Sequence, residues 1–160
     1  MDHRSARSAR EMLKKMRKGI TIGQAIAAAN LIRKHGIRLT ANFIIGFPDE
    51  TEETLNDTFA AMKKIRGKLV YNIFTPYPGT EAFEFCRRKG LINEDFNIAL
   101  YNHQSPENCF CLNIRKERFR KPASEIEEYV DKQNAKQDLT SILSLAALHK
   151  IHDYEVLGGV

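Results

Sequence analysis

Two proline-containing turns carry the residues whose types and spacing suit ligand binding. Each follows an apolar run, and they read GFPDET at Gly46–Thr51 and TPYPGT at Thr75–Thr80. Gly46 allows a ligand to approach the backbone closely, and the helix expected after this turn presents unpaired amide groups. In the second turn the prolines stiffen the backbone, and Tyr77 offers a ring with a polar tip. Taken alone, both patterns also suit ordinary strand-to-helix turns.

The three cysteines offer little metal chemistry. Cys86 falls on the apolar side of an expected helix, where a small buried thiol is the usual explanation. Cys109 and Cys111 are separated by a single residue, and two such thiols without further ligands are weak evidence for a metal site. We therefore predict no metal site and assign no catalytic residue. The isolated histidines favour surface or packing roles: His103, His149 and His152.

The elements that would position these turns alternate along the chain. Hydrophobic periodicity and capping signals predict helices and strands in the following order: helix within 1–20, helix 21–36, strand 37–45, helix 51–67, strand 69–74 and helix 80–90. This alternation predicts β-α-β units and a parallel sheet, and hence the α/β class. The run Phe43–Ile45 is apolar throughout, which predicts a strand buried on both faces.

The remainder of the chain changes character. Residues 93–121 read as irregular, and Ser124 with Glu127 matches a capping box that would begin a helix. Asp138 is placed to cap a last helix, which is apolar almost all round and is therefore expected to be buried. We expect this C-terminal part to form a helical extension.

Composition and charge limit the class of protein. The 160 residues are 42% hydrophobic and 28% charged, with a net charge of +5. No apolar run is long enough to span a bilayer, and the N-terminus lacks a signal peptide's apolar region, so we expect a cytoplasmic protein. Basic residues gather at Arg4–Lys18 and Arg115–Lys121. Because no aromatic platform accompanies them, we interpret them as solvated surface and expect no nucleic-acid binding.

Three segments together resemble the later strands of the radical S-adenosylmethionine superfamily, most closely its cobalamin-binding-domain branch. They are KGIT at Lys18–Thr21, NFIIGFPDET at Asn42–Thr51 and IFTPYPGT at Ile73–Thr80, in one order and at the family's spacings. The resemblance runs from about Met12 to Ile92.

The resemblance implies a partial (β/α) barrel at residues 1–92, of which this chain holds only the late strands, followed by the extension at 93–160. It also implies S-adenosylmethionine and a four-iron–four-sulfur cluster in the complete enzyme, which cleaves S-adenosylmethionine reductively to a 5′-deoxyadenosyl radical. The branch adds cobalamin as a candidate cofactor. The strands ending at Gly46 and Phe74 would be the fifth and sixth, which line the adenosine. The implied cofactor-binding residues are Ile44, Gly46, Phe47, Phe74, Thr75 and Tyr77.

The match to the family's G-x-I-x-G-x-x-E pattern is partial. Ile44 and Gly46 occupy its Ile and its second Gly, whereas Asn42 replaces the first Gly. Asp49 stands at the Glu position, with Glu50 beside it. These departures alter the polar end of the motif and keep the apolar contact through Ile44.

The family's C-x-x-x-C-x-x-C cluster loop does not occur in this sequence. We therefore expect a fragment of a larger enzyme that is inactive alone, with the missing N-terminal half supplying the cluster. Two alternatives are a subunit that completes a partner's barrel and a non-catalytic interaction module. An open strand edge would favour association with that partner or with a second copy. Methylation, ring closure and methylthiolation of a small-molecule substrate all fit the resemblance.

Overall fold

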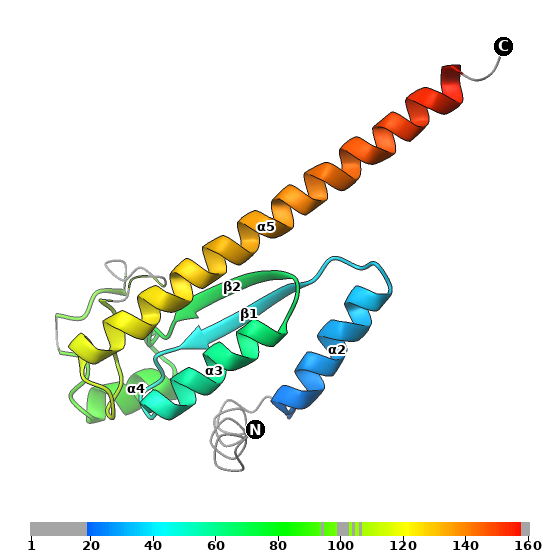
Figure 1. Cartoon of the computed structure of the whole chain (residues 1–160). Coiled ribbons are helices and arrows are strands. Elements are labelled where there is room, and N and C mark those ends of the chain that lie inside the picture. The colour runs from blue at the N-terminus through cyan, green and yellow to red at the C-terminus, as the bar shows by residue number, and fades with distance from the viewer. Residues whose placement is uncertain (1–18, 94, 99–102, 104, 106, 158–160) are drawn as a thin grey trace.

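The computed structural model describes residues 19–157, apart from 94, 99–102, 104 and 106. The helix expected within residues 1–20 lies almost wholly outside the described residues. The described elements are α2 (Ile22–Lys34), β1 (Thr40–Ile45), α3 (Glu52–Lys64), β2 (Lys68–Ile73), α4 (Glu81–Arg88) and α5 (Lys116–Leu157) (Figure 1). The described part contains no helix that is both long enough and apolar enough to cross a membrane.

Threonine caps begin the three shorter helices, as the sequence predicts. The Thr21 and Thr51 side chains accept hydrogen bonds from the backbone N–H three residues on, and both caps are closed reciprocally as capping boxes. Thr80 accepts in the same way from the Phe83 N–H. These caps fix where each helix starts, and therefore how long each preceding turn is.

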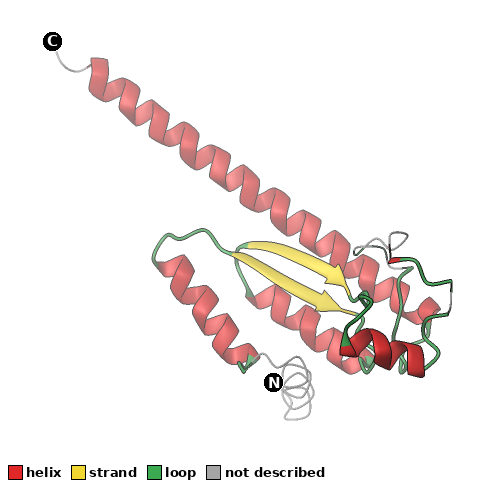
Figure 2. Ribbon diagram, turned by 180° about the vertical axis from the view of Figure 1, so that it is seen from behind, coloured by secondary structure: helices red, strands yellow, loops and turns green. Residues whose placement is uncertain are grey.

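The sheet is parallel, which confirms the predicted β-α-β arrangement. Within the described residues it has two strands, paired in register from Thr40 opposite Lys68 to Ile45 opposite Ile73. Both strands therefore end at the same end of the sheet, where the turns after Ile45 and Ile73 begin (Figure 2). β1 begins three residues later than the predicted 37–45, so the expected strand was too long. A two-stranded sheet is consistent with part of a larger α/β fold, and the described residues form no closed barrel.

Helices cover one face of the sheet and leave the other face open. Odd-numbered strand residues such as Ile45, Leu69 and Ile73 are buried in one core with side chains of α3 and α5. Even-numbered β1 residues point the other way, and Ile44 is 43% exposed. The prediction that Phe43–Ile45 is buried on both faces is therefore wrong, because α3 and α5 pack on a single side of the sheet.

The two edges of the sheet differ. The β2 edge is covered by the Asn134 side chain of α5, whose amide accepts from the Leu69 N–H at 2.9 Å and donates to the Leu69 C=O at 2.8 Å. The Ile73 N–H donates to the His103 C=O at the same edge. The β1 backbone bonds to β2 through alternate residues, as in Lys68 N–H to Leu39 C=O. The groups of Thr40, Asn42 and Ile44 therefore face the outer edge of β1.

Replacing Asn134 by alanine should destabilise the fold by about 1–3 kcal/mol, because two polar groups of Leu69 lose their partners. Urea unfolding should show this loss, and hydrogen exchange at the Leu69 amide should accelerate by more than exchange elsewhere in β2. Lys136→Ala is the matched control, since Lys136 is an exposed residue of the same helix. Equal unfolding free energies for the two variants would contradict the assignment.

α5 corrects the prediction for the C-terminal part. One helix runs from Lys116 through Pro122 to Leu157, so neither Ser124 nor Asp138 caps a helix start. Its buried residues recur at helical spacing on one stripe that passes Ser124, at Phe119, Ala123, Ile126 and Val130. Packing of this stripe on the sheet outweighs the local start signals. The domain boundary after residue 92 stays a prediction, although this stripe belongs to the main core.

The far half of α5 also differs from expectation. It projects beyond the sheet (Figure 1), and Leu139 and Leu143 are 58% and 62% exposed. The expectation that this segment is buried is therefore wrong for the described side chains, because no element of the described chain lies against them.

Candidate functional site

The candidate site lies at the end of the sheet where both strands finish. Parallel pairing brings the turns after Ile45 and Ile73 to one end of the sheet, as a shared site requires. Ile44 presents its side chain on the open face, directly opposite Asn72 of β2. On the opposite face, side chains of α3 and α5 pack against the strands.

The aromatic residues of the expected site divide between two places. The Phe47 and Phe74 rings pack together with centroids 4.9 Å apart, and Phe110 meets Phe74 edge to face at 6.2 Å. Phe74 is 9% exposed, so it supports the turn more than it offers a free surface. Tyr77 is exposed and stacks on His103, with 2.7 Å between the Tyr77 Oη and the His103 Nε2.

Thr75 is buried behind the aromatic residues, and its hydroxyl donates to the Ile73 C=O at 3.3 Å. It holds the end of β2 and lies away from the open face. Of the predicted set, Ile44 is the one whose side chain lies exposed on that face. The assignment of all six residues to cofactor binding stays a prediction.

Gly46 is fixed by its surroundings inside the protein. Its φ of 83° is one that side chains disfavour. A Cβ added there would lie 3.0 Å from the Phe119 Cζ and 3.3 Å from the Ile73 Cγ2. Glycine at this position therefore lets α5 approach the end of the sheet, in addition to any approach of a ligand.

Glu50 is the charged residue that sequence reasoning missed. Its carboxylate accepts hydrogen bonds from the backbone N–H groups of Gly46 and Phe47, and its side chain is 2% exposed. Burial raises its pKa to about 7, although both hydrogen bonds favour the ionised form. The sequence pattern placed Asp49 at the motif's acidic position, whereas in the structure Glu50 closes the turn. A carboxylate four residues after the strand-end glycine is the signal that could have found it.

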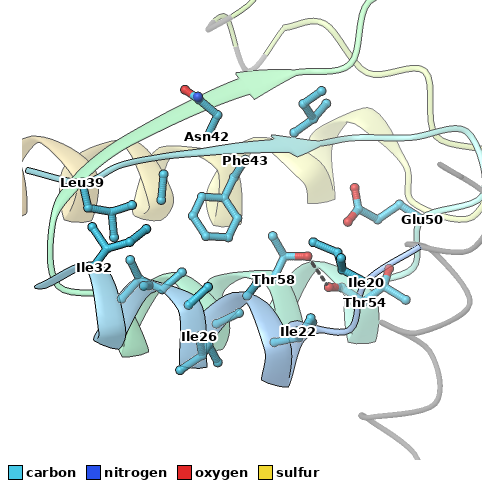
Figure 3. A pocket seen from close by; sticks show the side chains of 17 residues that line it. Ile20, Ile22, Ile26, Ile32, Leu39, Asn42, Phe43, Glu50, Thr54 and Thr58 are labelled. Atoms are coloured by element: carbon cyan, nitrogen blue, oxygen red, sulfur yellow. Dashed lines mark hydrogen bonds between the residues drawn. The ribbon is translucent and has the colours of Figure 1, made fainter. Parts of the chain in front are cut away.

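A cavity of about 400 Å³ adjoins this turn, between α2, β1 and α3 (Figure 3). Its walls are mainly aliphatic, with Ile22 and Ile26 of α2 facing Phe43 of β1. Glu50 and Thr54 add polar atoms at the end nearest the turn, while the Asn42 side chain points away toward the open face. The cavity lies along the outer edge of β1, beside the backbone groups that point away from β2.

Comparison with known proteins places the similarity in about half of the chain. An uncharacterised methyltransferase of Pyrococcus horikoshii is 41% identical over 76 residues, 47% of this chain and 17% of that protein. The tRNA-2-methylthio-N(6)-dimethylallyladenosine synthase of Thermosipho melanesiensis is 37% identical over 78 residues, 47% of this chain and 18% of the synthase. The Fusobacterium nucleatum synthase of the same name is 42% identical over 57 residues, 34% of this chain and 13% of the synthase.

No family model matches the chain. The chain spans less than a fifth of the length of these relatives. It is therefore similar to one part of a methyltransferase and of methylthio-adenosine synthases.

Proposed function

We propose that this chain supplies the adenosine-binding strands of a radical S-adenosylmethionine enzyme that transfers methyl or methylthio groups. The observation that carries the proposal is Ile44, exposed on the open face of a parallel sheet at the end where both strands finish. Ligands of parallel α/β folds bind at this end. The names of the relatives, methyltransferase and methylthio-adenosine synthase, match two of the reactions that the sequence resemblance implies.

The surroundings of Ile44 suit an adenosine. A purine needs an apolar surface for its ring and hydrogen-bonding groups at its edge. Ile44 offers the first, and the Asn42 side chain, which points toward the open face, offers the second. Glu50 holds the turn in place through the Gly46 N–H, which keeps the end of β1 rigid.

The cysteines do not suit an iron–sulfur cluster in this chain. Cys86 lies in α4 and packs with the aromatic residues around Phe74, whereas Cys109 and Cys111 lie beside Glu50. Among the described residues, no group of three or more metal-ligating side chains is arranged around one point. We propose that the cluster, which would supply the electron that cleaves S-adenosylmethionine, is held by the part of the enzyme outside this chain. Cobalamin is a further proposal that rests on the motif resemblance alone.

A further strand of the same enzyme is the partner we propose for β1. Its backbone would pair with the outer edge of β1, and its apolar side chains would fill the cavity against α2. The second candidate is that the strand comes from another protein. This chain would then be a subunit that completes its partner's barrel, or a non-catalytic interaction module. The outer edge of β1 and the aliphatic cavity beside it favour either arrangement over an isolated domain.

The substrate class to test first is an adenosine in tRNA, because the named synthases act on that nucleoside. This proposal departs from the sequence-based expectation of a small molecule and no nucleic acid. The basic run at the start of α5 is partly neutralised by ion pairs, Lys116 and Arg120 with Glu107, and Arg118 with Glu52. Contacts to tRNA would then come mainly from the remainder of the enzyme.

A chimaera tests the proposed function directly. The matching segment of the Thermosipho melanesiensis synthase would be replaced by the corresponding segment of this chain. We expect the chimaera to cleave S-adenosylmethionine to 5′-deoxyadenosine under reducing conditions, while this chain alone, reconstituted with iron and sulfide, binds no stoichiometric four-iron cluster.

Ile44→Asp in the chimaera should raise the KM for S-adenosylmethionine by about tenfold or more, the usual effect of losing an apolar contact. Ile37→Asp is the matched control, because Ile37 is also exposed but precedes β1 at the opposite end of the sheet. The proposal fails if a folded chimaera produces no 5′-deoxyadenosine, or if the two aspartate variants have the same KM.

A further inference from the structure

The segment Cys109–Asn113 lies directly against the turn that ends β1. The Leu112 N–H donates to the Pro48 C=O at 2.7 Å, and the Asn113 Nδ2 donates to the Asp49 C=O at 3.1 Å. Movement of this segment therefore pulls on the turn through two hydrogen bonds.

The thiols of Cys109 and Cys111 lie on one side of this segment. Phe110, between them, packs into the aromatic cluster with Phe74, while Cys111 belongs to the main core and Cys109 packs against it. This alternation is that of an extended backbone, in which side chains two residues apart point the same way. The two thiols are hydrogen-bonded to each other, and the Cys109 Sγ also lies 3.8 Å from the Ile114 C=O.

The surroundings make Cys109 the more reactive thiol. The hydrogen bond from the Cys111 thiol lowers the pKa of Cys109 to about 7, and Lys116 acts in the same direction against Glu117. The same contact, burial, and the carboxylates of Glu50 and Asp49 raise the pKa of Cys111. One half-buried thiolate beside one buried, protonated thiol is the arrangement of an attacking and a resolving cysteine.

We propose that Cys109 and Cys111 form a redox modification site, which low-molecular-weight disulfides oxidise reversibly to an intrachain disulfide. The Cys109 thiolate attacks one sulfur of the small disulfide, whose S–S bond breaks and releases the first thiolate. Cys111 then loses its proton to solvent and attacks the Cys109 Sγ, which displaces the second thiolate. Two cysteine thiols are oxidised to one disulfide, and the small disulfide is reduced to two thiols.

Oxidation should change the conformation of the turn that ends β1. Two steps along an extended backbone cover roughly 6.6 Å, whereas disulfides accept Cα separations of roughly 4.4–6.8 Å, with most near the middle of that range. Closing the disulfide therefore tends to shorten the segment, and Leu112 and Asn113 transmit the change to Pro48 and Asp49.

The test uses the full chain with glutathione disulfide as the oxidant. We expect mass spectrometry to show the loss of two hydrogen atoms with no retained glutathione, and peptide mapping to place the bond between Cys109 and Cys111. Dithiothreitol should restore the starting mass. Backbone amide signals of Gly46 and Phe47 should shift on oxidation, while those of α2 stay in place.

Variants separate the two steps. Cys111→Ser should stop at a stable glutathione adduct on Cys109, and Cys109→Ser should react at least about tenfold more slowly than the unaltered chain. Cys86→Ala should oxidise like the unaltered chain, because Cys86 is fully buried on α4. Retained glutathione on the unaltered chain, or two free thiols after exposure to the oxidant, would overturn the proposal. Peptide mapping of the unaltered chain decides this even if a variant fails to fold.

Discussion

Gly46→Ala should lower the free energy of unfolding by about 2–5 kcal/mol. Two costs add. The positive φ of 83° disfavours any side chain by about 1–2 kcal/mol. The new methyl would also press on the Phe119 ring at 3.0 Å and on Ile73 at 3.3 Å, and both residues are buried and cannot swing away.

Gly79 provides the matched control. Its φ of 84° is nearly the same, but a Cβ there meets nothing within 4 Å. Gly79→Ala should therefore cost only the conformational part, about 1–2 kcal/mol. Urea unfolding of both variants measures the difference, which is the steric contribution at Gly46. A Phe119→Leu background should relieve part of it, and equal losses at the two glycines would disprove the contact with α5.

This contact changes how a Gly46 variant can be used. Sequence reasoning assigned Gly46 to close approach of a ligand, and a bulky replacement would block that approach. Because the same replacement displaces α5, lost binding would not distinguish the two roles. Ile44, whose side chain is exposed, is the cleaner position for a binding test.

The local parts of the fold could be predicted from the sequence because their causes are local. Thr21, Thr51 and Thr80 begin helices through contacts within three residues, and periodicity then gives the helix bodies. Parallel pairing followed from the alternation of helix and strand. Which face of β1 stays open did not follow, because it depends on the side chosen by helices distant in sequence.

The errors in the C-terminal part have the same origin. Ser124 carries a genuine helix-start pattern, but the stripe from Phe119 to Val130 packs on the sheet as one continuous helix. Asn134 covers the β2 edge from 65 residues away, which no local pattern indicates. The position of the candidate site could be predicted, because it follows from where the two parallel strands end. Glu50 was missed because its role depends on how tightly the turn folds back over it.

Glu50 should make the stability of this chain fall as the pH rises from about 4.5 to about 7. Burial raises the pKa of its carboxyl group from 4.5 to about 7 in the folded state, so within this window the folded chain holds a proton that the unfolded chain has released. A group that binds more protons when folded stabilises the fold at low pH and loses that contribution as the pH rises through its folded pKa. The shift corresponds to about 3 kcal/mol, fully present below about pH 4.5 and absent above about pH 7.

Glu50→Gln isolates this effect from the other titrating groups. A glutamine can still accept from the Gly46 N–H, and it has no charge to bury, so it should match the unaltered chain near pH 4.5 and exceed its stability by about 2–3 kcal/mol near pH 7.5. The urea measurements should end near this pH. At higher pH the lowered pKa of Cys109 adds stability as the pH rises, which would introduce a second pH dependence. Glu53→Gln, an exposed position in the first turn of α3, is the control and should show no such divergence. A constant difference between Glu50→Gln and the unaltered chain at every pH would mean that the Gly46 and Phe47 amides keep Glu50 ionised despite its burial, and a ¹³C titration of its carboxyl carbon with a midpoint near 4 would establish the same.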